Sequence, residues 1–126
     1  MPSGEEMADD FLAMIDDDHG QESTRMVMAE IEGAVVGFAR VKLHLVAEDP
    51  DESKIPYALL DEIVVLETAR RRGIGQQLVD WAVQIARDAG DASIRLNVID
   101  GNVGAQALYD RNGFRPLYVE MEKPLG

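Results

Sequence analysis

A loop rich in arginine and glycine most constrains the fold of this 126-residue chain. The apolar residues 59–66 before the loop predict a buried strand, and residues 74–89 after it repeat apolar side chains with a helical period. A strand, a glycine turn and a helix in this order predict an α/β unit. The free amides in the first turn of such a helix suit a phosphate or pyrophosphate. The loop consists of Arg70, Arg71, Arg72, Gly73, Ile74 and Gly75.

The loop by itself leaves two interpretations open. It lacks the Gly-Lys-Ser/Thr ending of a Walker loop and the third glycine of a dinucleotide-binding fingerprint. It is therefore either an anion cradle assisted by arginine side chains or a plain turn beside a solvated arginine cluster. The rest of the chain has to decide between them.

The remaining pattern predicts one α/β domain over residues 1–126. Residues 5–17 are expected to form an amphipathic helix, and residues 25–31 and 34–46 two strands joined by a tight turn at Glu32-Gly33. Gly37 indicates a bulge or a close backbone approach. Strand 59–66 is expected to be buried on both faces. A strand over 92–98, a short helix over 102–112 and one or two strands over 114–123 complete a mixed sheet.

Composition excludes several classes of protein. The chain has 24 acidic and 12 basic side chains and no cysteine, so we expect neither a nucleic-acid binder nor a thiol enzyme. No apolar run reaches membrane length and the first residues are acidic, so a cytoplasmic protein without a membrane partner is expected. Residues 1–62 contribute the whole net charge of −12. This acidity either serves solubility or attracts a cationic ligand.

A second motif favours the anion-cradle interpretation of the loop. It consists of Asn102, Ala105, Tyr109 and the pair Gly113-Phe114. Together with Arg70-x-x-Gly73-x-Gly75, it resembles the paired motifs of the GNAT superfamily of N-acetyltransferases. The resemblance runs from about residue 25 to the end. It implies the acyl-coenzyme A N-acyltransferase fold, whose central sheet has two splayed strands, here with a shortened N-terminal part.

The resemblance also implies roles for particular residues. Tyr109 would act as the general acid for the departing thiolate, since a phenol can protonate a thiolate, or would be only a core aromatic residue of the last helix. Asn102 would contact the pantetheine arm of acetyl-coenzyme A or only cap its helix. Backbone groups of Val65 would also meet the pantetheine. The pyrophosphate would be held by Arg70, Arg71, Arg72, Gly73, Ile74, Gly75 and Gln76.

A base for the amine acceptor is expected at Asp61 or Glu62. These neighbours should lie on opposite faces of their strand, so at most one should point into the cleft, and both could instead border its exposed end. His44 is a further candidate, or a solvated histidine. No histidines and carboxylates have metal-ligand spacing, so no metal is expected.

The sequence leaves two candidate functions. The first is acetyl transfer from acetyl-coenzyme A to a small cationic amine or a protein amine, by direct attack in a ternary complex. The alternative is a non-catalytic coenzyme A-binding or regulatory module. The short N-terminal part would leave the acceptor wall incomplete, so a homodimer is also considered.

Overall fold

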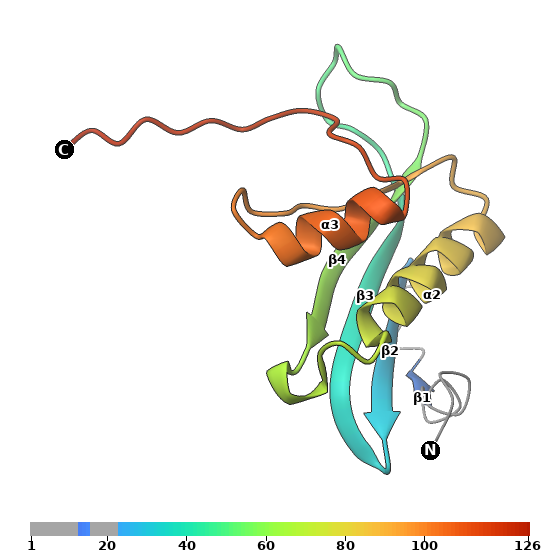
Figure 1. Cartoon of the computed structure of the whole chain (residues 1–126). Helices are drawn as coiled ribbons and strands as arrows, with labels where there is room; N and C mark the ends of the chain where they lie inside the picture. Colours follow the sequence, from blue (N-terminus) through green and yellow to red (C-terminus); the bar gives the residue numbers. More distant parts are fainter. Residues whose placement is uncertain (1–12, 16–22) are drawn as a thin grey trace.

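The computed structural model describes residues 13–15 and 23–126, in which one five-stranded sheet carries two α-helices (Figure 1). The strands lie in the order β1-β2-β3-β4-β5, and only β4 and β5 run parallel. The predicted mixed sheet of an α/β domain is therefore confirmed. The elements are β1 (Ala13–Ile15), β2 (Thr24–Ile31), β3 (Ala34–Leu45), β4 (Tyr57–Val65), η1 (Glu67–Ala69), α2 (Ile74–Asp88), β5 (Ile94–Arg95) and α3 (Val103–Arg111).

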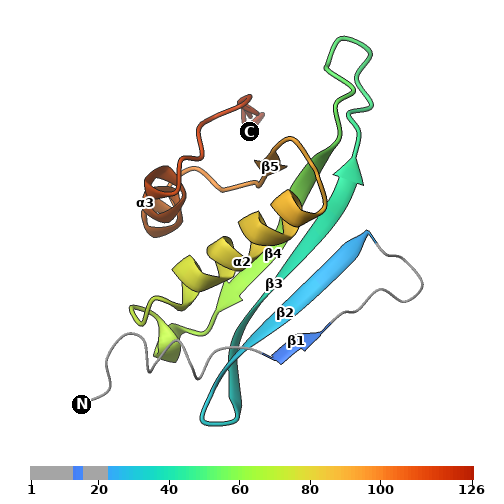
Figure 2. The ribbon, with the colours of Figure 1, turned by 90° about the vertical axis from the view of Figure 1, so that its right-hand side faces the viewer.

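The core lies between α2 and one face of the sheet. Figure 2 shows α2 running along the strands. Its apolar stripe buries Leu78 and Val79 completely, and Val27 and Val41 of the facing strands are also fully buried. The helix ends before Gly90, whose φ of 84° favours glycine. The predicted helix over 74–89 is confirmed, and it places the glycine loop at the edge of the core.

The two parallel strands separate soon after they meet. β4 and β5 pair only through Ala58 with Ile94 and Leu59 with Arg95. The predicted strand over 92–98 therefore shrinks to two residues, because the chain beyond Arg95 leaves β4. Strand 59–66 is not buried on both faces either, since Val64 is 42% exposed and Leu66 is 50% exposed. The splay expected from the resemblance is present and opens one side of β4.

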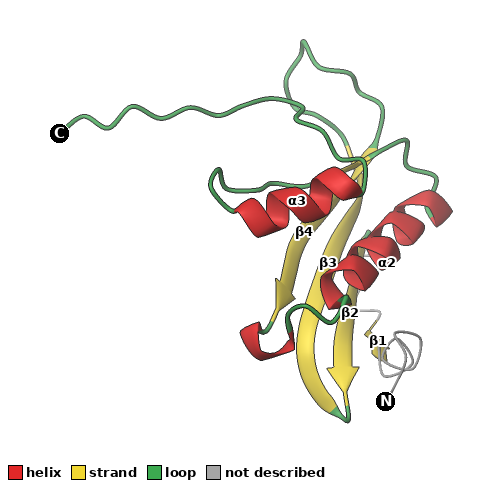
Figure 3. Cartoon of the chain, viewed as in Figure 1, coloured by secondary structure: helices red, strands yellow, loops and turns green. Residues whose placement is uncertain are grey.

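Both ends of the chain depart from the sequence pattern. Within the expected helix 5–17, Ala13–Ile15 form β1 by pairing with β2, and the rest lies outside the described residues. The one or two strands expected over 114–123 are wrong. Residues 114–126 form neither helix nor strand and extend away from the sheet (Figure 3). Alternating apolar and polar side chains do not make a strand unless the backbone can hydrogen-bond to a neighbouring strand.

Candidate active site

A groove occupies the gap that the splay leaves beside β4. Its volume is about 320 Å³, and it lies between residues 60–64 of β4 and residues 96–99. The start and middle of α3 close it through Asn102, Ala105 and Tyr109. The structure thus brings four predicted site residues to one cavity, namely Asp61, Glu62, Asn102 and Tyr109.

The predicted anion cradle lies at the start of α2, next to the end of β4. Gly73 is the N-cap with φ of 76°, and no side chain caps this helix end. Gln77 is the first residue whose N–H reaches back to the Gly73 carbonyl, at 3.1 Å. The amides of residues 74–76 therefore have no partner within the helix, as expected for a first turn. An uncapped first turn at a glycine fits a pyrophosphate group.

The three arginines surround this turn without being buried. Arg70, Arg71 and Arg72 are all exposed, and Arg71 has a left-handed φ of 69°. The Nε of Arg70 lies 3.4 Å from the carbonyl oxygen of Val65. The Arg70 guanidinium thus lies near the end of β4, and because it is exposed it stays hydrated until an anion binds.

The backbone of Val65 faces the open side of β4. The Leu66 N–H donates to the Val36 carbonyl at 2.8 Å, so residue 66 points its backbone toward β3. In an antiparallel pair the N–H and C=O groups of adjacent residues point to opposite sides of the strand, so those of Val65 point away from β3. Val65 therefore presents them to the side that β5 leaves vacant, where an extended ligand could pair with them.

Tyr109 is the buried residue of α3. Its side chain is 8% exposed and meets the Phe114 ring edge-on at 5.8 Å between centroids. Burial raises the pKa of the Tyr109 phenol above its ordinary value of 10.0, because the charged form is desolvated. A phenol is already protonated at neutral pH, and the raised pKa makes Tyr109 a weaker acid, so it can donate only where strong negative charge develops beside it.

This raised pKa has a consequence for stability at alkaline pH. The Tyr109 phenol ionises at a lower pH in the unfolded chain than in the folded one. The stability that its raised pKa contributes is therefore complete below about pH 10, and it is lost as the pH rises through the pKa of the folded chain. We expect the melting temperature of the wild type to fall more steeply above pH 10 than that of Tyr109→Phe. Parallel curves from thermal melts across this range would contradict the effect of burial.

Asp61 and Glu62 do not lie on opposite faces as predicted. Arg40 is opposite Glu62 while Val41 is opposite Leu60, so Asp61 is the extra residue of a bulge. Both carboxylates line the groove, and one guanidinium holds them. Arg40 donates to Asp61 Oδ2 from Nε at 2.9 Å and from the terminal nitrogen at 2.6 Å.

The two carboxylates differ in how they are held. Glu62 accepts one bond from Arg40 at 3.1 Å, and its side chain is 46% exposed. Asp61 is 21% exposed and has Lys42 Nζ at 3.8 Å as a second cation. Glu62 is therefore the more exposed and less tightly held of the two carboxylates. The sequence offered no indication of Arg40 beyond its place on a polar strand face.

Asn102 and Gln76 have structural partners in addition to their predicted roles. The Asn102 Oδ1 accepts from the Ala105 N–H at 3.2 Å, so Asn102 does cap α3. The side-chain amides of Gln76 and Asn112 bond each other reciprocally, at 2.6 and 2.9 Å. This pair joins the start of α2 to the end of α3 and fixes the cradle relative to Tyr109. Sequence reasoning missed Asn112.

His44 lies outside the groove lining. Its Nδ1 is 2.8 Å from Asp91 Oδ1, and its N–H donates to Oδ2 of the same carboxylate at 2.9 Å. With φ of 58°, His44 forms an irregularity at the far end of β3. It ties β3 to the loop after α2, and so it is neither a groove base nor simply solvated.

Comparison with known proteins identifies the family. The acetyltransferase (GNAT) family matches residues 1–114, so the chain belongs to this family. It is 38% identical over 72 residues to mycothiol acetyltransferase from Beutenbergia cavernae, a match that covers 55% of this chain and 24% of that protein. It is 29% identical over 85 residues to the chloroplastic GCN5-related N-acetyltransferase 6 of Arabidopsis thaliana, covering 68% of this chain and 30% of that one.

A solved structure supports the fold independently. The aminoglycoside N-acetyltransferase AAC(6')-Iy, solved in complex with coenzyme A, superposes with a TM-score of 0.72 at 19% identity and covers 85% of this chain and 79% of that one. The chain spans less than a third of the length of the two curated relatives. In the part of the chain that the structure describes, no helix combines the length and apolarity that a bilayer crossing requires.

Proposed function

We propose that this chain transfers an acetyl group from acetyl-coenzyme A to an amine, by direct attack of the amine in a ternary complex. The observation that carries the proposal is a juxtaposition. Tyr109 lines the groove on the open side of β4, and the bonds between Gln76 and Asn112 hold the uncapped first turn of α2 against the end of the same helix, α3. Membership of the acetyltransferase family and the names of the two relatives support the same activity.

The residues present fit coenzyme A. The free amides of residues 74–76 and the side chains of Arg70, Arg71 and Arg72 would hold the pyrophosphate. The outward backbone of Val65 would pair with the pantetheine, and Asn102 would contact it from the opposite wall. When bound, the thioester supplies the activated acetyl group. No step requires a metal.

Tyr109 would hold the proton that the leaving sulfur requires. A thiol has an ordinary pKa of about 8.5, well below that of a phenol near 10, so the thiolate is the weaker base and leaves without full protonation. The neutral phenol of Tyr109 would donate its proton as negative charge develops on sulfur. Because Tyr109 lines the groove, the proton would come from the α3 side of the site.

We expect Glu62, and not Asp61, to remove the proton from the amine. Glu62→Gln should lower turnover about 10²-fold near neutral pH, because a neutral amide accepts no proton. Asp61→Asn is the matched control, and its loss should be smaller because Asp61 mainly anchors Arg40. Rates of thiol release against pH would test this. A larger loss in Asp61→Asn would reverse the assignment.

One observation favours the second candidate, a non-catalytic coenzyme A-binding module. Arg40 engages both carboxylates, so neither is a bare base in this structure. Asp61 and Glu62 are the charged residues that line the groove, and the cations Arg40 and Lys42 lie against them.

Thiol release from acetyl-coenzyme A across a panel of small and peptide amines tests the proposal. Amine-dependent release that Tyr109→Phe diminishes is the expected result. A melting temperature raised by acetyl-coenzyme A without turnover on any amine would support the binding module. No thermal shift at saturating ligand would contradict both, since a ligand at 100 times its dissociation constant stabilises a fold by about 2.7 kcal/mol.

A further inference from the structure

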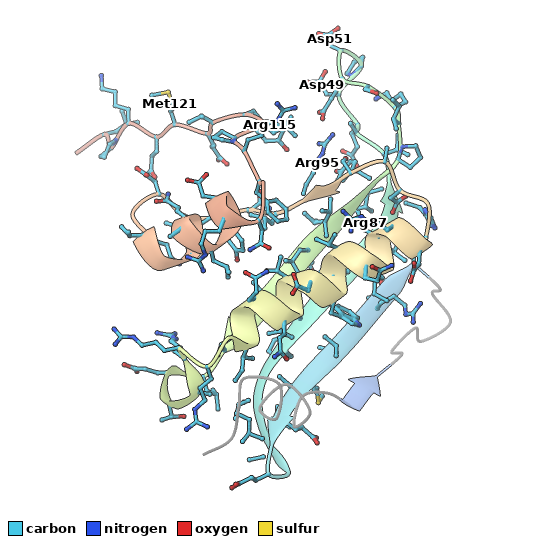
Figure 4. All side chains as sticks on the ribbon, turned by 45° about the vertical axis from the view of Figure 1, so that its right-hand side comes forward. Asp49, Asp51, Arg87, Arg95, Arg115 and Met121 are labelled. Carbon is cyan, nitrogen blue, oxygen red and sulfur yellow. The ribbon has the colours of Figure 1, made fainter. Side chains whose placement is uncertain are left out.

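The side chains of Gln76 and Asn112, which we call the amide pair, form a closed hydrogen-bonded link between α2 and α3. Gln76 Nε2 donates to Asn112 Oδ1 at 2.6 Å, and Asn112 Nδ2 donates to Gln76 Oε1 at 2.9 Å. Figure 4 shows the two helices with their side chains, and Arg115 marks the chain just beyond the end of α3. Among the described residues, no other hydrogen bond or ion pair joins α2 to α3.

Every side-chain N–H of the amide pair has an acceptor. Gln76 Nε2 also donates to Asp80 Oδ1 at 2.9 Å, one turn further along α2. Asn112 Nδ2 also donates to the Leu108 carbonyl oxygen at 2.8 Å, one turn back along α3. A network in which every donor is satisfied fixes the orientation of each amide. The amide pair therefore joins the two helices in one defined geometry.

Each partner of the amide pair is also bound to one functional part of the site. The backbone N–H of Gln76 is one of the three free amides in the first turn of α2. The backbone N–H of Asn112 donates to the Tyr109 carbonyl oxygen at 3.1 Å. The amide pair thus connects the backbone that would meet the pyrophosphate to the backbone that carries the phenol.

The packing beside the amide pair is less specific. A Cβ atom at Gly75 would lie 3.4 Å from Leu108 Cδ2, so the first turn of α2 lies close to the end of α3. Leu108 is only partly buried against the core. Apolar contacts are not directional, whereas a hydrogen bond weakens steeply as its angle departs from linearity. The amide pair therefore determines an orientation of α3 that packing leaves open.

We propose that the amide pair positions Tyr109 relative to the bound cofactor, by relating the place of the pyrophosphate on α2 to α3. This inference rests on the proposed function, because it takes Tyr109 as the proton donor to the leaving sulfur. Gln76 and Asn112 would then be positioning residues that act through Tyr109. A misplacement of about 1 Å can slow a reaction about 10²-fold, so a link remote from the sulfur can control turnover.

Asn112→Leu, made in the wild type and in Tyr109→Phe, tests whether the amide pair acts through the phenol. Leucine keeps the approximate shape of the side chain and removes its hydrogen bonds. In the wild-type background we expect kcat for thiol release to fall at least about tenfold, with the dissociation constant of acetyl-coenzyme A within about twofold. In the Tyr109→Phe background no further fall is expected. Equal losses in both backgrounds, or an unchanged kcat, would overturn the proposal.

A double variant separates positioning from stability. Gln76→Met with Asn112→Leu replaces both amides by apolar side chains of similar shape, a change that can leave stability nearly unaltered. Its kcat should fall as far as that of Asn112→Leu and no further, since the two amides act as a unit. A double variant with the kcat of the wild type would show that packing suffices, and would overturn the proposal.

Gln84→Met is the matched control for these substitutions. Gln84 Nε2 donates to Asp88 Oδ1 at 2.8 Å, one turn along α2, as Gln76 does to Asp80, but it has no bond to α3. The kcat of Gln84→Met should equal that of the wild type. A loss as large as that of Asn112→Leu would mean that any broken amide bond on α2 slows turnover, and would overturn the proposal.

Amide spectra of the chain titrated with ADP test the connection without catalysis. ADP carries a pyrophosphate but neither a pantetheine arm nor a thioester. The amides of residues 74–76 and 108–113 should shift in the wild type, and only those of residues 74–76 in Asn112→Leu. Wild-type shifts confined to residues 74–76 would overturn the positioning role and leave the proposed function standing. No shift at residues 74–76 would overturn the anion cradle and the positioning role that depends on it.

Discussion

Replacing Tyr109 by phenylalanine is expected to lower turnover on the order of 10³-fold while acetyl-coenzyme A still binds. The substitution removes one oxygen atom and keeps the ring that packs edge-on against Phe114. Loss of a positioned general acid typically slows a reaction by about 10² to 10⁴-fold. Since Tyr109 lines the groove and the substitution removes only its hydroxyl group, the effect should fall on kcat and not on affinity.

Steady-state thiol release and calorimetric titration with acetyl-coenzyme A would separate these two quantities. Tyr118→Phe is the matched control, because Tyr118 is 70% exposed and does not line the groove. Equal kcat values for Tyr109→Phe and the wild type would remove the acid assignment. A dissociation constant that rises as much as kcat falls would indicate a packing role instead.

Replacing Gly37 by alanine should have the largest effect on stability. A Cβ atom at Gly37 would lie 2.6 Å from the Val64 carbonyl oxygen and 3.6 Å from Leu78 Cδ1. The first contact is with backbone in the adjacent strand, so β3 and β4 would have to move apart beneath α2. We expect a loss of about 3 kcal/mol in the free energy of unfolding, which would lower the melting temperature by roughly 10 °C.

Gly104→Ala is the control for this substitution. Gly104 lies in the first turn of α3, and a Cβ there meets nothing within 4 Å. The free energy of unfolding of the Gly104→Ala variant should rise by at most about 1 kcal/mol. Chemical denaturation of both variants measures the difference. If Gly37→Ala were as stable as Gly104→Ala, the close approach of β3 and β4 at this point would be contradicted.

The strand, loop and helix around Gly73 could be predicted because local pattern determines them. Nine-residue β4 and fifteen-residue α2 bury apolar side chains in the same core, and the chain turns between them through η1 and the positive φ of Arg71 and Gly73. The motif of α3 likewise predicted that Asn102 and Tyr109 share an element, and its capping residue behaves as expected. These features depend on residues near one another in sequence.

Features that depend on pairing across the sheet could not be predicted in this way. One extra residue at Asp61 turns both carboxylates toward the groove, and alternation assumes that no such residue exists. The bond between Gln76 and Asn112 joins residues 36 apart, and the pattern around each suggests only a polar surface. The segment 114–123 alternates like a strand, yet β pairing requires an edge that a sequence does not specify.

The amide spectrum of the chain titrated with acetyl-coenzyme A tests the central claim most directly, because it needs no acceptor. The claim is that the first turn of α2, the open side of β4 and the start of α3 form one coenzyme A site. The largest shifts should fall on the amides of residues 74–76, Val65 and residues 97–109. Spectra unchanged at saturating ligand, or shifts centred on the distant pair His44 and Asp91, would contradict it.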